Sequence, residues 1–216
     1  MHNFTPRLFI VVGSPASGKD ELISAVNTIG TLHAEIVPKH TERAIRIDDG
    51  DEMICKYILN GNGSKVLNEQ CDMDGCDIIY RNYGETYGIK TSEIWDKLRD
   101  GIIQVAVVGN VDAINKLKDK FGNLAVVIYV YSQIDKKTFR KRELEKLNKS
   151  FENKTGLESS EDDYIKRRVA EFDKAWKIYV DNFMLFDHVL IYAEKQEDLF
   201  DQIFRLFKAY EKGLLK

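Results

Sequence analysis

A glycine-bounded run near the start of the chain has the residue types that bind phosphate. Five apolar residues, 8–12, predict a buried strand, and the next residues match the pattern G-x-x-x-x-G-K. Glycines let backbone N–H groups curl around phosphate oxygens, a following helix adds the positive end of its dipole, and the lysine brings a mobile charge. We therefore expect the phosphates of a nucleotide to contact Gly13, Ser14, Ala16, Ser17, Gly18, Lys19 and Asp20.

The residue after the lysine departs from this motif. The motif has Ser or Thr there, whose hydroxyl binds Mg²⁺, whereas this chain has Asp20 followed by Glu21. A carboxylate is also a good Mg²⁺ ligand and can replace the hydroxyl directly or through water, although it adds negative charge beside a polyphosphate. Asp20 is therefore the candidate metal ligand.

Strands and helices alternate along the chain, and this alternation predicts the elements that hold the loop. Apolar residues at helical spacing predict a helix over 21–29, directly after the loop. Near-continuous apolar runs predict buried strands at 102–108 and 124–131, and a final strand is expected at 186–191. Helices are expected at 91–98, 111–120, 134–148 and from residue 160. Such alternation favours a parallel sheet, so we expect an α/β fold with three layers, α/β/α.

Several other residues are expected to serve the structure. A β-hairpin is predicted around Gly84, followed by a helix that Thr91-Ser-Glu caps. His188, beside an apolar strand, is expected to be structural. Alternating spacings of four and three predict a packing stripe of Ile165, Val169, Phe172, Trp176, Tyr179 and Phe183, and the last helix should bury Leu199, Ile203, Leu206, Phe207 and Tyr210.

The composition indicates one soluble domain with room for insertions. With 216 residues the chain can bury a full core, and its net charge of -3 gives no general basic surface for nucleic acid. Three cysteines without zinc-like pairing are expected to be free thiols in a reducing compartment. Since no apolar run suits a membrane span or a signal peptide, we expect a cytoplasmic protein without membrane or nucleic-acid partners.

The order of these features resembles the guanylate kinase family over nearly the whole chain. The features are the phosphate loop, a His-Thr-x-Arg-x-x-Arg element at 40–46, a Tyr-Gly hairpin, a basic helix and a late Ile-x-x-Arg helix. The resemblance implies ATP and Mg²⁺ as cofactors and a monomer or homodimer. It also implies a P-loop core (1–34, 93–137 and 171–216), an acceptor-binding insertion (35–92) and a helical lid (138–170).

The resemblance assigns acceptor-binding roles residue by residue. Arg43 and Arg46 match the family's Ser-x-Thr-Thr-Arg-x-x-Arg and would bind the acceptor phosphate as bidentate forks. Tyr87-Gly88 matches the end of the family's Asn-Tyr-Tyr-Gly, in which the tyrosine hydroxyl also reaches that phosphate.

The lid is expected to supply catalytic arginines. Arg168 matches a lid arginine of the family, and either Arg140 or Arg142 matches another. With Lys19, these residues would neutralise the two anions that react. An acceptor phosphate is largely dianionic at pH 7 and attacks without a catalytic base, so no catalytic His or Asp is needed.

Other positions depart from the family where it reads the guanine base. Alignment on Tyr87-Gly88 puts Ile78 in place of a base-reading glutamate, with Asp77 beside it as a candidate acceptor-binding residue, and puts Ile89 in place of a small hydroxyl residue. The family's Asp-Val-Gln-Gly is replaced by Gly109-Asn-Val-Asp112. An apolar side chain cannot accept hydrogen bonds from guanine, which weakens base discrimination. The ribose 1,5-bisphosphate phosphokinases are similar in fold, carry Gly-Lys-Asp in the loop and lack the same glutamate.

We therefore expect an ATP-dependent kinase that transfers the γ-phosphate to the phosphate of a small acceptor. GMP, which would become GDP, is the family default, and a sugar phosphate is the nearest alternative. A guanylate-kinase-like binding module with weak or lost catalysis is a further hypothesis. Asp20 and Ile78 favour the module, whereas Lys19 and the arginines favour the kinase.

Overall fold

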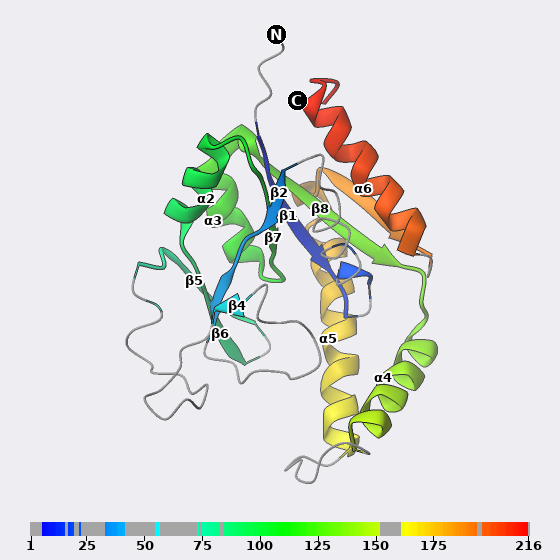
Figure 1. The fold of residues 1–216 in the computed structure, drawn as a ribbon. Coiled ribbons are helices and arrows are strands. Elements are labelled where there is room, and N and C mark those ends of the chain that lie inside the picture. Colours follow the sequence, from blue (N-terminus) through cyan, green and yellow to red (C-terminus); the bar gives the residue numbers. More distant parts are fainter. Residues whose placement is uncertain are drawn as a thin grey trace.

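A parallel five-stranded sheet forms the centre of the computed structural model (Figure 1). The structure describes residues 6–15, 17–19, 22, 33–41, 55–56, 73, 75–82, 84–151, 161–193 and 196–215. The strand order is β2-β7-β1-β8-β9, with β1 (Leu8–Gly13), β2 (Ala34–Ile36), β7 (Ile103–Val107), β8 (Ala125–Ser132) and β9 (His188–Tyr192).

Helices cover both faces of this sheet because its inner strands are apolar on both sides. Leu8, Ile10 and Val12 pack toward α2 (Thr91–Arg99) and α3 (Val111–Phe121), whereas Phe9 and Val11 pack toward α6 (Gln196–Glu211). Figure 1 shows α2 and α3 on one side of the sheet and α6 on the other. The expected three-layer α/β/α fold with a parallel sheet is confirmed.

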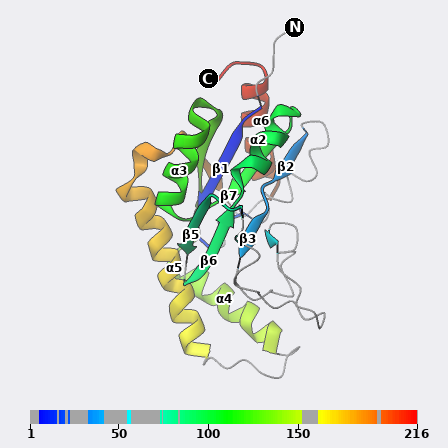
Figure 2. The ribbon, with the colours of Figure 1, turned by 90° about the vertical axis from the view of Figure 1, so that its left-hand side faces the viewer.

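A second, four-stranded sheet lies beside the carboxyl end of the first (Figures 1 and 2). Its order is β4-β3-β6-β5, with β3 (Lys39–Thr41), β4 (Cys55–Lys56), β5 (Ile78–Asn82) and β6 (Glu85–Ile89). β5 and β6 form the predicted hairpin, which turns at Gly84 with φ 88°. Glycine suits this turn because it adopts positive φ without a Cβ clash.

The two helices α4 (Lys136–Phe151) and α5 (Glu161–Asp181) lie side by side and extend beyond the sheet (Figures 1 and 2). Phe139 of α4 stacks on Phe172 of α5 with ring centroids 4.7 Å apart. α5 also returns to the core, where Tyr179 stacks on Tyr129 of β8 at 4.5 Å. Short 3₁₀ turns precede β8 and β9 at Gly122–Leu124 and Phe183–Leu185. Across the described ranges, no helix has the length and apolarity to span a membrane.

The expected domain boundaries fall inside regular elements. The lid was expected to begin at residue 138, within α4, and to end at 170, within the uninterrupted α5. The insertion was expected to run from 35, within β2, to 92, within α2. The division into three bodies stays a prediction.

The expected packing stripe of α5 is wrong at two positions. Trp176 is 45% exposed and Phe183 is 61% exposed, whereas Ala175 is buried. The reason is that α4 covers only the first half of α5, and β8 of the main sheet covers the second half on the side of Ala175 and Tyr179. Phe183 lies beyond the end of α5.

The last helix and His188 agree with expectation. Leu199, Ile203, Phe207 and Tyr210 are buried, and Leu206 packs against them while partly exposed. His188 Nε2 lies 2.8 Å from the Tyr210 hydroxyl, a contact between β9 and α6. Burial lowers the pKa of His188, although the neighbouring Asp187 carboxylate opposes this. The contact supports the structural role.

A distant carboxylate, not the predicted Thr91-Ser-Glu, caps α2. The helix begins at Thr91, and its N-cap residue Lys90 makes no side-chain cap hydrogen bond. Instead Asp77, just before β5, accepts hydrogen bonds from the Thr91 backbone N–H at 2.9 Å and from the Thr91 hydroxyl. Lys120 of α3 donates to the same carboxylate at 2.6 Å. Burial would raise the pKa of Asp77, but these partners outweigh it and lower the pKa to about 2.

We predict that Asp77→Asn lowers stability at neutral pH. The carboxylate is 37% exposed, so its ion pair is partly screened and the loss should be about 1 kcal/mol. Since the folded pKa lies below that of an unfolded Asp, the stabilisation is complete above about pH 4 and is lost as the pH falls through about 2. Chemical denaturation of both proteins from pH 7 down to 2 measures this difference.

Asp96→Asn is the matched control for this prediction. Asp96 lies on α2 and pairs with Arg99, but both side chains are largely exposed. Its removal should change stability by a few tenths of a kcal/mol, about the value of an exposed helix pair. An equal effect of the two substitutions at every pH would contradict the capping role of Asp77.

Candidate active site

The phosphate loop begins where the strand order of the main sheet reverses. β1 leads to β2 on one side, whereas β8 leads to β9 on the other, so the carboxyl ends of β1 and β8 flank a topological switch point. Ligands of open α/β sheets bind at such points. The predicted loop therefore lies at the position on the sheet that is suited to a ligand.

Close packing requires both glycines of the loop. A Cβ on Gly13 would lie 2.5 Å from Ser17 Oγ and 2.8 Å from the Val130 carbonyl oxygen of β8. Gly18 has φ 86°, and a Cβ there would lie 2.8 Å from the Tyr192 ring. Ser17 N–H donates to the Ser14 carbonyl at 3.2 Å, which closes the turn between them. The loop is thus pressed against the ends of β8 and β9.

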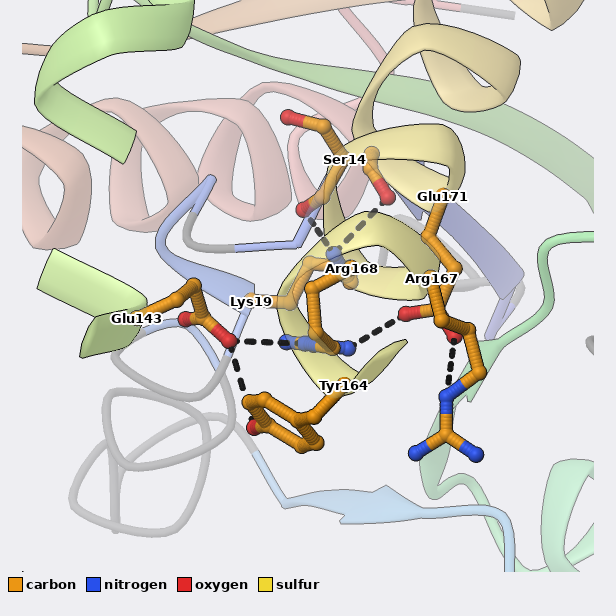
Figure 3. A network of polar contacts seen from close by, with 8 residues as sticks. Ser14, Lys19, Glu143, Tyr164, Arg167, Arg168 and Glu171 are labelled. Atoms are coloured by element: carbon orange, nitrogen blue, oxygen red, sulfur yellow. Dashed lines mark hydrogen bonds and ion pairs between the residues drawn. The ribbon is translucent and has the colours of Figure 1, made fainter. Parts of the chain in front are cut away.

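The ammonium group of Lys19 folds back over this loop (Figure 3). It donates to the Gly13 carbonyl at 2.8 Å, to the Ser14 carbonyl and to Ser17 Oγ at 3.2 Å. Lys19 and Leu22 are helical, and Leu22 N–H bonds to the Gly18 carbonyl at 2.9 Å. Strand, loop and lysine therefore have the arrangement that the motif predicts.

Arg168, the predicted lid arginine, lies between two carboxylates (Figure 3). Its Nε donates to Glu143 of α4 at 2.7 Å, and its Nη1 donates to Glu171, one turn further along α5. The Tyr164 hydroxyl also donates to Glu143, at 3.4 Å. The side chains of Glu143 and Glu171 are only 1% and 7% exposed, against 17% for Arg168. Burial alone would lower the pKa of Arg168, but the two carboxylates outweigh it and raise the pKa above its usual value.

Glu143 and Glu171 were not singled out from the sequence. Glu143 lies among basic residues on a helix of low apolar content, which is typical of a solvated surface. The spacing of three between Arg168 and Glu171 is a signal that could have indicated this ion pair. The other predicted lid arginines also lie on α4, where Arg140 is exposed and Arg142 is half-buried.

The predicted acceptor-binding tyrosine, Tyr87, belongs to an aromatic pair. Tyr87 of β6 stacks on Tyr80 of β5 at 5.6 Å, and Lys39 Nζ lies 5.3 Å from the centre of the Tyr87 ring. Gly88 is tightly enclosed, because a Cβ there would lie 2.7 Å from both Cys76 Sγ and Met73 Sδ. The predicted Tyr-Gly element therefore has a clear packing reason for its glycine.

The two isoleucines at the predicted base-reading positions face the core. Ile78 and Ile89 lie opposite each other in the hairpin, and both are fully buried. Nearby, Asn110 caps α3 by accepting from Ala113 N–H at 3.0 Å, and its Nδ2 donates to the Arg81 carbonyl of β5 at 3.0 Å. This part of Gly109–Asp112 therefore ties the hairpin to the core.

Several predicted site residues lie outside the described residues. These are Ala16, Asp20, Arg43, Arg46 and most of the helix expected at 21–29. Within the described ranges, no group of three or more His, Cys, Asp or Glu side chains gathers as a metal site. The roles of all the predicted site residues, including Asp77, Tyr87 and Arg168, stay predictions.

We predict that Gly13→Ala destabilises the fold by about 1–3 kcal/mol, the usual cost of forcing a methyl group into a packed region. The new Cβ would meet the backbone of β8, which cannot move without disturbing the sheet. Gly109→Ala is the control, since its Cβ would lie 3.1 Å from the movable Asn82 amide. Urea unfolding compares the variants, and an equal or smaller effect of Gly13→Ala would contradict the close approach.

Comparison with solved structures supports the fold. The crystal structure of guanylate kinase from Anaplasma phagocytophilum matches with a TM-score of 0.58 and 13% identity, over 98% of this chain and 89% of that chain. No protein-family model and no curated protein sequence matches the chain. The chain therefore has a guanylate-kinase-like fold, with a sequence far removed from that structure.

Proposed function

We propose that the protein is an ATP-dependent phosphotransferase that transfers the γ-phosphate of ATP to the phosphate group of a small acceptor. The observation that carries this proposal is the loop from Gly13 to Lys19, which lies at the switch point of the sheet with its lysine held over it. The fold shared with a guanylate kinase supports the same class of reaction.

The described loop residues fit a polyphosphate. The carbonyls of Gly13 and Ser14 hold the Lys19 ammonium at the loop, so its charge is placed where phosphate oxygens would bind. Mg²⁺ takes many of its ligands from phosphates and water, so one or two protein oxygens suffice, and Asp20 is our candidate. A bound Mg²⁺ would neutralise charge on the phosphates.

The reaction needs little more from the protein than positioning and charge. An acceptor phosphate is mostly dianionic at pH 7 and is itself the nucleophile. The protein must bring two anions into line, neutralise them and exclude water, which suits Lys19 and the candidate arginines. We assign Arg168, with Arg140 or Arg142, to the donor side and Arg43, Arg46 and Tyr87 to the acceptor phosphate.

Two acceptor classes follow from different observations. GMP is the first candidate because the matching structure is a guanylate kinase. A sugar phosphate is the second, because Ile78 and Ile89 are buried against each other and offer no hydrogen bond to a base edge. A preference for one class over the other would show which observation governs the acceptor.

The test is ADP release from Mg·ATP with a panel of nucleoside monophosphates and ribose phosphates. We predict that Lys19→Met lowers kcat/KM with the best acceptor by about 10²–10³-fold, the usual cost of losing one preorganised donor to a transition-state charge. The variant keeps most of the length of the side chain but loses its charge and its N–H donors.

Lys97→Met is the matched control for Lys19→Met. Lys97 pairs with Glu35 at 2.9 Å on the surface, and both side chains are about half exposed. Its replacement should leave kcat/KM unchanged. If no acceptor gives ADP release that depends on Lys19, the phosphotransferase proposal is wrong, and Mg·ATP binding without transfer would favour a binding module.

A further inference from the structure

Two buried carboxylates from different helices contact one arginine at the lid. Glu143 comes from α4 and Glu171 from α5, and both accept from the guanidinium of Arg168 (Figure 3). A buried ion pair is weak evidence for stability, because the cost of removing charges from water offsets much of their attraction. The same two helices already share an apolar contact between Phe139 and Phe172. The carboxylates therefore need an explanation beyond holding α4 to α5.

The geometry of the hydrogen bonds fixes how the guanidinium is oriented. A guanidinium has five N–H donors in one plane. Nε donates to Glu143 and Nη1 donates to Glu171, so two contacts on different nitrogens set both the direction and the tilt of this plane. Among the described residues, the hydrogen bonds of Arg168 use only these two nitrogens, and Nη2 makes no hydrogen bond to any of those residues.

Arg168 extends from the same edge of the sheet as the phosphate loop. Val130 of β8 pairs with Gly13, and α4 begins shortly after β8 ends. α5 is anchored to β8 through Tyr179 and Tyr129, and Arg168 lies eleven residues before Tyr179 (179 − 168), about 16 Å along the helix.

We propose that Glu143 and Glu171 are positioning residues that aim Arg168 at the polyphosphate of a nucleotide bound by Lys19. This inference rests on the proposed function and adds two residues to it. It also explains why two acidic side chains are buried beside a site that must bind anions: they touch the arginine and hold its plane, while its remaining donors face the ligand. The carboxylates act through Arg168 and do not touch the nucleotide.

The test is a set of double-mutant cycles on Mg·ATP binding, measured by calorimetry. We expect Glu143→Gln and Glu171→Gln each to weaken binding by about tenfold, the value of a charge-assisted hydrogen bond that is no longer well oriented. In an Arg168→Lys background, which keeps the charge but loses the planar fork, neither substitution should weaken binding further. Glu145→Gln is the control, because Glu145 also lies on α4 but is 58% exposed.

A kinetic measurement separates positioning from a purely structural role. The KM for ATP should rise in Glu143→Gln and Glu171→Gln while the KM for the acceptor stays the same, whereas a loss of folded enzyme would lower the apparent kcat and change neither KM. Circular dichroism checks that each variant is folded at the assay temperature. If Glu143→Gln does not fold, the more accessible Glu171→Gln carries the test.

Each outcome decides the proposal. Equal effects of Glu143→Gln in the wild-type and Arg168→Lys backgrounds, or an effect no larger than that of Glu145→Gln, would overturn it. A wild-type protein that binds Mg·ATP but phosphorylates no acceptor would disprove the proposed function. The double-mutant cycles on Mg·ATP binding would then decide whether Glu143 and Glu171 position Arg168. A wild-type protein that binds no Mg·ATP would overturn both.

Discussion

The parallel pairing of β1 with β8 is the contact on which the rest of the site depends. Gly13 lies opposite Val130, and the space where a side chain would stand is filled by the Val130 carbonyl and Ser17. This pairing fixes the position along β8 at which β1 ends and the phosphate loop begins. It also sets where α4 begins, because α4 follows β8 after a short connection. One strand pair therefore brings the lysine of the loop and the arginines of α4 to the same edge.

The helices α4 and α5 are packed together, and α5 also contacts β8 of the main sheet. Phe139 and Phe172 join the helices through an aromatic stack, and Arg168 joins them through charge. α5 continues without a break from residue 161 to its contact with Tyr129, so a hinge inside it would have to break helical hydrogen bonds. Movement of the helix pair therefore requires a tilt of the whole of α5 together with a change in residues 133–135, which precede α4.

The sequence predicted what depends on neighbours along the chain and missed what depends on distant partners. The apolar runs of β7 and β8 and the glycines and lysine of the loop form local patterns, and each was located closely. The cap of α2 was missed because Asp77 lies fourteen residues before the helix start.

Burial of individual helix residues was the least predictable feature, for the same reason. The exposure of Trp176 and Phe183 depends on how far α4 covers α5, which no spacing within α5 reveals. Glu143 is buried because Arg168, 25 residues later in the chain, lies against it. The candidate arginine was thus found through a resemblance, whereas the carboxylates that hold it required the structure. Glu143 and Glu171 were not predicted because each helix was interpreted from its own sequence, without the side chains of the neighbouring helix.

The hairpin of β5 and β6 shares the core of the main sheet. Ile78, Tyr80 and Ile89 belong to the same buried cluster as Leu8 and Ile10 of β1. Moving the hairpin away would expose these side chains at a cost of about 1.5–3 kcal/mol each, and would also break the contact of Asn110 with Arg81. The described hairpin is therefore held firmly against the core, so in the proposed phosphotransferase a closing movement would involve the helices α4 and α5 rather than this hairpin.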